Sequence, residues 1–460
     1  MPPASTPIFA PVHDTDDSAR HLGELIQWLR IPSVSSYERH NDDTSDAARW
    51  LSEKFAHAGI EAETIPTEGH PLIFAETPEV EGAPVALVYG HYDVQPAEPL
   101  DLWTSPPFEP TIRDGKLFAR GATDDKGQLL THIHSICDWV ASGKTLPLQV
   151  KFLVEGEEEV GSQNLERMLP VLSEKLACDC VVISDSGQYA EGQPAITYGL
   201  RGIATYEITV QGPAMDLHSG SFGGAVANPG IALCHLLSSL VDRQGRIQIP
   251  GFYDSVVELS DKERDEWRSL PQDEAAFAKS VGVDELFGEA GFSADERRWA
   301  RPTLDINGLT CGHQGEGVKT IIPAIATAKI SCRLVPGQDP AKITKGLSEH
   351  LQQHALPGTV VKLHPDHGAP AMVTATDSPY IKAANDAIET AFGVAPVLIR
   401  EGGSIPIVAQ FQDALKCDCL LLGWGQSDDN AHSPDEKFNV DDFHRGIAAS
   451  TELWRRLGNL

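Results

Sequence analysis

A chain of 460 residues is too long for a single hydrophobic core, so we expect two domains. Its hydrophobic content of 41% and aromatic content of 7% are typical of a soluble globular protein. The net charge of −30, from 36 basic and 66 acidic residues, argues against nucleic acid and against an anionic membrane surface as partners.

The amino-terminal thirty residues contain no basic start followed by an apolar stretch, and no apolar run is long enough to cross a bilayer. We therefore expect no signal peptide, no membrane span and a cytoplasmic location. Eight cysteines are scattered along the chain, with two Cys-x-Cys pairs that begin at Cys178 and Cys417. Each pair precedes or opens a strand-like run, which favours reduced core cysteines over a zinc or redox site.

The elements predicted along the chain begin with helices over residues 16–60, separated by a loop at residues 31–33. Short continuous apolar runs follow, and they are typical of strands buried on both faces. These runs are residues 85–89, 150–154, 181–184 and 419–422. Amphipathic helices lie between them, as in the segment 129–140. Strands that alternate with helices predict an α/β fold with a largely parallel central sheet.

The middle of the chain has a different pattern. Residues 205–210 and 327–335 alternate between apolar and polar, as in a sheet with one solvated face. A helix is expected from residue 228 to 240, and residues 252–300 are charged and helix-like. We interpret residues 197–378 as a second domain inserted into the first.

The first candidate site residues follow the apolar run 85–89. In Gly90-His91-Tyr92-Asp93, the side chains of His91 and Asp93 point to the same side, because strand side chains alternate with period two. His91 can then bind a metal ion while Asp93 holds its geometry. Taken alone, this pattern fits a buried structural histidine better.

The pattern recurs, however, in four further segments. Asp124 precedes the predicted helix 129–140, where it can cap the helix or bridge two cations with its two oxygens. The acidic cluster 155–159 follows a buried strand, and its carboxylates repel one another unless a cation lies among them. An exposed acidic turn is the alternative for this cluster.

Asp185 follows the run 181–184, and His432 lies in a polar segment after the run 419–422. Taken alone, Asp185 fits an aspartate in a turn, and His432 fits a histidine in a polar loop. Together the candidate ligands offer nitrogen and oxygen donors without thiolate, which suits a hydrolytic site for zinc or manganese. The candidate ligands are His91, Asp124, Glu159, Asp185 and His432.

Several segments, in order along the chain, resemble the dinuclear zinc metallopeptidases, a group that includes carnosinase, aminoacylase and carboxypeptidase G. These segments are residues 90–96, 120–127, 158–162, 184–185 and 431–433. Others resemble the branch of the cytosolic non-specific dipeptidase and carnosinase, namely residues 103–108, 216–220, 319–323, 333–336 and 400–406. The resemblance implies a zinc-peptidase-like catalytic domain of residues 1–196 and 379–460. It also implies that residues 197–378 form an inserted α+β lid and dimerisation domain.

The resemblance implies a role for each candidate ligand. Asp124 is expected to bridge two metal ions. His91 and Asp185 are expected to bind one ion, and Glu159 and His432 the other. Zinc is the expected metal and manganese the alternative, since both accept these donors.

The resemblance also implies the residues that act beside the metals. Asp93 is expected to orient His91, and Glu158 to be the general base. Glu157 is the alternative base, because the run of glutamates leaves the register open. His218 is expected to stabilise the developing oxyanion from the second subunit of a homodimer.

The substrate's terminal carboxylate is expected to bind to Arg333 and Ser404, with Thr320 and Gly403 nearby. The forked donors of arginine suit a carboxylate. Apart from the resemblance, a salt bridge at a strand end explains Arg333 equally well.

The predicted function is metal-dependent hydrolysis of dipeptides or short peptides with a free carboxyl terminus. A water between the two metals would attack the carbonyl with help from the glutamate base. A deacylase of N-acyl amino acids on the same scaffold is the alternative, and a non-catalytic binding protein is an alternative of another class.

Overall fold

The structure is a computed structural model that describes residues 8–12, 16–271 and 273–460. The chain folds into two compact units. Unit 1 contains the residues up to Tyr198, then Thr374–Ile399 and Gln410–Leu460, and unit 2 contains Gly199–Val373 and Arg400–Ala409. The sequence interpretation placed residues 400–409 in the first domain. They group with unit 2 because the Arg201 backbone N–H donates to the Glu401 carbonyl, and the Ser404 hydroxyl donates to the Arg201 carbonyl.

Unit 1 is built on a mixed sheet whose four central strands are parallel. These strands are, in spatial order, β6 (Gln149–Glu155), β3 (Val85–His91), β7 (Cys180–Ile183) and β17 (Asp418–Gly423). The sheet continues to the antiparallel strands β2 (Leu72–Glu76) and β1 (Glu61–Ile65) on one side, and to the antiparallel strand β8 (Ala195–Leu200) on the other. The last two residues of β8 belong to unit 2, where they pair with the antiparallel strand β15 (Met372–Val373). Strand β16 (Val397–Glu401) also pairs with β8. The prediction of an α/β fold with a largely parallel central sheet is confirmed.

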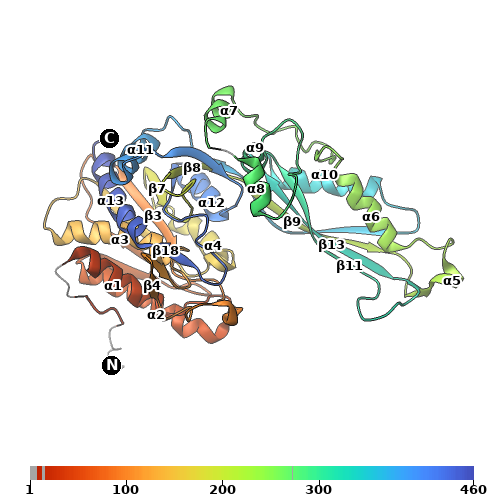
Figure 1. Cartoon of the computed structure of the whole chain (residues 1–460), viewed down its shortest axis with the longest axis horizontal. Coiled ribbons are helices and arrows are strands. Elements are labelled where there is room, and N and C mark those ends of the chain that lie inside the picture. The colour runs from red at the N-terminus through yellow and green to blue at the C-terminus, as the bar shows by residue number, and fades with distance from the viewer. Residues whose placement is uncertain (1–7, 13–15, 272) are drawn as a thin grey trace. The chain divides into compact units, whose positions relative to one another are not determined.

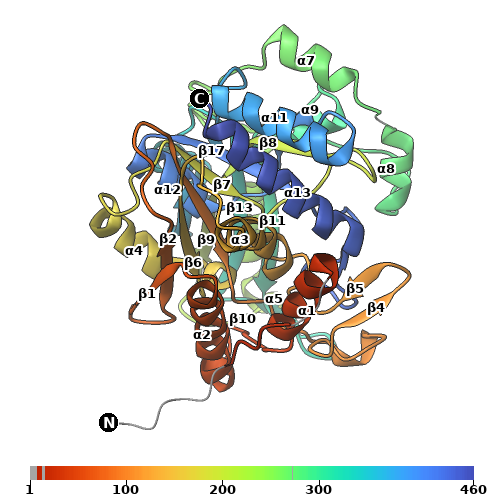
Figure 2. The same ribbon diagram turned by 90° about the vertical axis from the view of Figure 1, so that its left-hand side faces the viewer.

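Helices cover both faces of this sheet, which explains why the central strands are apolar throughout. Ala86 and Val88 belong to a core shared with helices α1 (Asp17–Leu29), α2 (Asn41–His57), α3 (Lys126–Ala141), α11 (Pro379–Phe392) and α13 (Val440–Leu457). The Tyr89 ring packs on Phe411 of α12 (Pro406–Leu415), with ring centroids 5.0 Å apart. Figure 1 shows α3 and α13 on one side of β3 and α12 on the other, and Figure 2 shows α13 next to α11.

The site region lies where the parallel strands end, since carboxyl ends of parallel strands share one edge of a sheet. Strand β3 ends at His91, β6 is followed by the turn η3 (Glu158–Val160) and α4 (Gln163–Leu172), and β7 is followed by Asp185. A separate small sheet contains β4 (Thr111–Arg113), β5 (Lys116–Phe118) and β18 (Lys437–Asn439). Lys437 pairs with Phe118 in this sheet, which brings the loop before α3 close to the loop before α13.

Unit 2 is a four-stranded antiparallel sheet with helices on one face. The strands, in spatial order, are β11 (Thr303–Cys311), β13 (Ile325–Leu334), β9 (Gly202–Gln211) and β14 (Val360–Ala369). Every second residue of β9 is buried, and these residues share a core with α6 (Pro229–Leu240) and α10 (Pro340–Gln353). The described residues of the charged region 252–300 form the short helices α7 (Asp261–Arg268), α8 (Glu274–Ser280) and α9 (Ala294–Trp299).

A two-stranded arm of unit 2 pairs β10 (Leu217–His218) with β12 (Ile321–Ile322), beside the short helix α5 (Ser219–Phe222). Within the described ranges, no helix combines the length and the apolar character needed to span a membrane.

Candidate metal centre

His91 ends strand β3 and its side chain is completely buried. Its Nδ1–H donates to the backbone carbonyl of Asp93 at 3.1 Å. In the neutral ring the lone pair therefore lies on Nε2, an atom without a hydrogen-bond partner among the described residues. Nε2 faces Asp124 Oδ1 at 3.2 Å and Asp185 Oδ2 at 4.0 Å. A buried lone pair that faces two carboxylates requires a proton or a cation between them, so these residues fit a metal ion.

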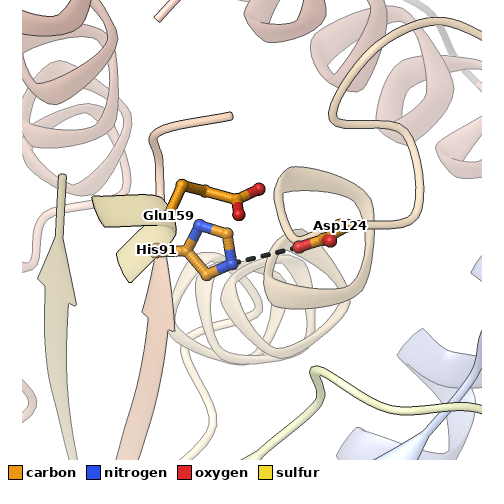
Figure 3. Close-up of side chains that lie close together, drawn as sticks. All are labelled: His91, Asp124 and Glu159. Carbon is orange, nitrogen blue, oxygen red and sulfur yellow. Dashed lines mark ion pairs between the residues drawn. The ribbon is translucent and has the colours of Figure 1, made fainter. Parts of the chain in front are cut away.

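Asp124 presents one carboxylate oxygen to each of two histidines. Oδ1 faces His91, and Oδ2 lies 2.9 Å from His432 Nε2. Glu159 Oε2 is 3.3 Å from the same His432 nitrogen. His91, Asp124 and Glu159 each offer a ligand atom within 4.8 Å of the others. Figure 3 shows these three side chains next to one another. The structure thus brings the five candidate ligands together, with Asp124 between His91 and His432.

The pKa values in this cluster reflect its excess of carboxylates. Burial by itself lowers the pKa of His91, but the Asp124 and Asp93 carboxylates raise it well above its ordinary value. Hydrogen bonds to Asp124 and Glu159 raise the pKa of His432 to about 10. Without metal, protons on the histidines balance the carboxylates, and a divalent cation can replace those protons.

The four glutamates of the acidic cluster have different surroundings. Glu155, at the end of β6, is buried and accepts a hydrogen bond from the Tyr89 hydroxyl at 2.7 Å. Glu157 accepts from the Asn164 amide at 2.7 Å. Glu159 lies with the candidate ligands, and its side chain is only 4% exposed. This burial argues against the exposed acidic turn as an explanation of the cluster.

Glu158 is the glutamate that interacts electrostatically with several candidate ligands. Burial raises its pKa well above the ordinary value; Asp185 and Glu159 add to this effect, and His91 opposes it. A carboxyl with a raised pKa, next to candidate metal ligands, suits a proton-transfer role.

Asp93 holds the turn that carries Glu158 and Glu159. Its carboxylate accepts hydrogen bonds from the Ser35 hydroxyl at 2.6 Å and from the backbone N–H groups of Glu158 and Glu159 at 3.3 and 3.1 Å. Asp93 Oδ1 is also 3.4 Å from His91 Nδ1. Asp93 therefore contacts His91 through its backbone carbonyl and its carboxylate together.

The residues expected to bind the substrate's carboxylate lie in unit 2. Arg333 Nη1 donates to the Ser404 hydroxyl at 2.8 Å. Among the described residues, no ion pair within 4.0 Å joins Arg333 to a carboxylate, and Asp305 acts on the guanidinium only from a greater distance, where it raises the pKa of Arg333 against the effect of burial. A side chain added at Gly403 would meet no atom within 4 Å, so the backbone there faces open space.

His218 and Thr320 lie together on the two-stranded arm, where both are exposed. His218 Nδ1 accepts from the Gly220 N–H at 3.0 Å, so Nε2 carries the proton in the neutral ring. Thr320 was expected near Arg333, but the arm adjoins the start of β13, and Arg333 lies near the end of that strand. Ile325 and Arg333 are separated by roughly 26 Å along the strand, at about 3.3 Å per residue. One chain therefore does not bring Thr320 and Arg333 together.

Two contact residues of the centre were not assigned from the sequence. Gln95 Nε2 donates to Glu159 Oε2 at 2.7 Å, and Gln95 belongs to the same segment as His91. Glu436 is buried and accepts the backbone N–H of Asp124 at 3.2 Å. Their positions close to His91 and His432 in the sequence are the only signal that could have indicated them.

A cluster of imidazole and carboxylate donors, at the carboxyl ends of parallel strands in an α/β unit, is the arrangement of a metal-dependent hydrolase. The comparison with known proteins is more specific. The chain belongs to the peptidase family M20/M25/M40, whose profile matches residues 87–456. The predicted metallopeptidase family is thereby confirmed.

Relatives and solved structures match nearly the whole chain. It is 34% identical over 439 residues to the Cys-Gly metallodipeptidase dug1 of Schizosaccharomyces pombe, and this alignment covers 92% of each protein. It is 35% identical over 401 residues to the Beta-Ala-His dipeptidase of Homo sapiens, which covers 85% of this chain and 78% of the relative. The crystal structure of the M20 family metallo-carboxypeptidase Sso-CP2 from Sulfolobus solfataricus superposes with a TM-score of 0.86 at 33% identity, and the match covers 96% and 99% of the two chains.

Proposed function

We propose that this protein is a dipeptidase that uses bound metal to hydrolyse dipeptides or short peptides with a free carboxyl terminus. The observation that carries the proposal is the Asp124 carboxylate, which offers one oxygen toward His91 and the other toward His432. Two relatives that match most of the chain bear the names of dipeptidases, which supports the same reaction class.

The donors suit two divalent metal ions, with zinc as the first choice and manganese as the second. His91 and Asp185 would hold one ion, Glu159 and His432 the other, and Asp124 both. Bound ions of this kind supply Lewis acidity, which polarises the scissile carbonyl and makes water more acidic.

Glu158 is the general base in this proposal. It would accept a proton from the attacking water and donate one to the leaving amine, which balances the protons of peptide hydrolysis. Its electrostatic interactions with His91, Asp185 and Glu159 support this choice. Glu157 is the weaker candidate, because its carboxylate is engaged by Asn164.

Arg333, Ser404 and the open backbone at Gly403 would bind the terminal carboxylate of the substrate. A guanidinium without a carboxylate partner attracts a carboxylate ligand, and its fork allows two hydrogen bonds. A site of this kind requires a substrate with a free carboxyl terminus. Dipeptidases and deacylases of N-acyl amino acids share this requirement.

His218 would act from the second subunit of a homodimer, together with Thr320. The separation of these residues from Arg333 along β13 supports this arrangement, because one chain cannot offer all three to one small substrate. The Nε2–H of His218 suits a donor to an oxyanion. Large apolar side chains are exposed on and beside the arm, which fits burial against a second copy. These are Met215 at 66%, Phe222 at 43% and Val318 at 94% exposed.

A cytoplasmic location completes the proposal. All eight cysteines of the chain are free, including the pair Cys178 and Cys417, whose sulfur atoms are 3.7 Å apart. Thiols persist in the reducing environment of the cytoplasm, whereas disulfides form in secreted proteins.

The proposal is tested with one panel of substrates. Protein loaded with zinc or manganese is given free dipeptides, β-alanyl-histidine, tripeptides and N-acetyl amino acids, each with a chelator-treated control. We expect chelator-sensitive cleavage of dipeptides. Cleavage confined to N-acetyl amino acids would assign the deacylase reaction instead, and no cleavage with metal bound would favour the binding protein.

A further inference from the structure

Glu436 accepts hydrogen bonds from the loop that carries Asp124, although it takes no part in the proposed chemistry. Its side chain is fully buried. Oε2 accepts from Arg120 Nη1 at 2.6 Å and from the Gly121 N–H at 2.9 Å. Oε1 accepts from the N–H groups of Thr123 at 3.0 Å and Asp124 at 3.2 Å. Both oxygens of one carboxylate are thus occupied by donors from one short loop.

This loop depends on the carboxylate for its shape. Gly121 has a φ of +84°, and a side chain there would meet Val94 Cγ1 at 2.7 Å. The backbone N–H groups of Gly121 and Thr123 converge on Glu436 as in an anion-binding nest. An amide in place of this carboxylate keeps one acceptor oxygen and turns an NH2 donor toward the remaining donors, so one pair of donors loses its acceptor.

The second loop, which carries His432, also needs external support. Asn430, His432 and Asp435 have φ values of 56°, 62° and 57°, a region that residues other than glycine rarely adopt. Such backbone persists where surrounding contacts hold it. Glu436 comes directly after this strained segment.

A second contact joins the same two loops. The Thr123 hydroxyl donates to Asp429 Oδ2 at 3.0 Å, and Asp429 also accepts the Gln426 N–H at 2.7 Å. Glu436 and Asp429 therefore connect both ends of the segment 429–436 to the loop before α3. The ligand His432 lies between these two points of attachment.

We propose that Glu436 is a positioning residue that fixes the distance between Asp124 and His432, and with it the affinity for the metal ion that these two residues share. The inference rests on the proposed metal centre. Metal sites require their ligands within about 0.5 Å of the productive geometry, so a small shift of either loop weakens binding. His91 ends a central strand of the sheet, so the ion beside it is less affected.

The test compares two charge-removing substitutions of nearly equal shape. Glu436→Gln removes the charge that holds the loops. Glu24→Gln is the matched control, because Glu24 is also buried in unit 1 and forms an ion pair with Lys54 at 2.7 Å. Zinc affinity is measured by competition with a chromophoric chelator, and ligand geometry by the absorption spectrum of the cobalt-substituted protein.

We expect Glu436→Gln to weaken the binding of one of the two ions by about 10–100-fold and to change the cobalt spectrum. Glu24→Gln should lower the melting temperature and leave the zinc affinity and the cobalt spectrum as in the wild type. A purely structural role for Glu436 would give the same result as the control.

Thr123→Val keeps the inference testable if Glu436→Gln does not fold. It removes only the hydroxyl contact with Asp429, and we expect a smaller loss of affinity, roughly 3–10-fold, for the same ion. If the folded variants have the zinc affinity and the cobalt spectrum of the wild type, this inference is wrong, and the proposed function is unaffected. A wild-type protein that binds no metal would overturn the proposed function and this inference together.

Discussion

His432 Nε2 lies 2.9 Å from Asp124 Oδ2, although unit 2 separates the two residues in the sequence. The contact follows from the small sheet in which Lys437 of β18 pairs with Phe118 of β5. Each strand leads into or out of one of the two loops. A long-range strand pairing thus places a histidine and a carboxylate where one cation can bind both.

Glu158→Gln should leave metal binding intact and lower kcat by about 100- to 10,000-fold, the usual contribution of general acid–base catalysis. Glu157→Gln is the matched control, because its side chain contacts Asn164 and should matter little for turnover. Steady-state kinetics with metal analysis of both proteins checks this. A large loss in Glu157→Gln with normal turnover in Glu158→Gln would exchange the two assignments.

Arg333→Lys should raise KM for dipeptides by about 10-fold or more, since a lysine cannot reproduce a two-pronged contact with a carboxylate. Dipeptide amides lack that carboxylate, so both proteins should cleave them more slowly than dipeptides. The rate of amide cleavage should be the same in the variant and the wild type. A uniform change for both kinds of substrate would show that Arg333 does not bind the carboxyl terminus.

Two inactive variants should complement each other if His218 acts across subunits. His218→Ala and Glu158→Gln, mixed under conditions of subunit exchange, form heterodimers in which one site is complete. We expect on the order of a quarter of wild-type activity from an equal mixture, as a twofold dimer predicts. Each parent mixed with itself is the control. Inactive heterodimers, purified through two different tags, would exclude the cross-subunit role.

His132 should make the protein sensitive to acid. It is buried in α3, with Nε2 at 2.8 Å from the Ser184 hydroxyl and Nδ1 at 2.9 Å from the Ser450 hydroxyl. Burial lowers its pKa from 6.5 to about 3. Between about pH 3 and pH 6.5, this histidine binds a proton in the unfolded chain but not in the folded protein. The free energy of unfolding is therefore unaffected above pH 6.5 and falls by about 1.4 kcal/mol per pH unit below it.

His132→Gln keeps a polar side chain that does not titrate. Urea unfolding at pH 7 and pH 5 should show a loss of stability that is about 2 kcal/mol smaller in the variant than in the wild type. Equal losses in the two proteins would exclude His132 as a source of acid sensitivity.

The sequence predicts the central strands well, because strands buried on both faces are apolar at every position. The runs at 85–89 and 150–154 are strands β3 and β6, and the polar residues that follow them lie at the edge where the ligands gather. The hairpin β1–β2 was not predicted. Strand β1 is mostly exposed and has no apolar alternation, so its pairing with β2 is its main stabilisation.

The contacts that hold the site together were less visible in the sequence. In the run Pro434-Asp435-Glu436-Lys437, a glutamate resembles an exposed charge, and only the tertiary fold shows that it is buried beside Arg120. Similarly, a motif fixes the neighbours of Thr320 in sequence but not its distance from Arg333. Residues 400–409 join unit 2 through contacts with Arg201, which local patterns do not encode.

Stepwise addition of zinc to metal-free protein tests the central claim, that Asp124 lies between two metal ions. We expect activity to reach its maximum at about two equivalents per chain, as a two-metal site requires. Asp124→Asn should weaken both binding steps and abolish turnover. Full activity at one equivalent, or two tightly bound ions in Asp124→Asn, would contradict the account.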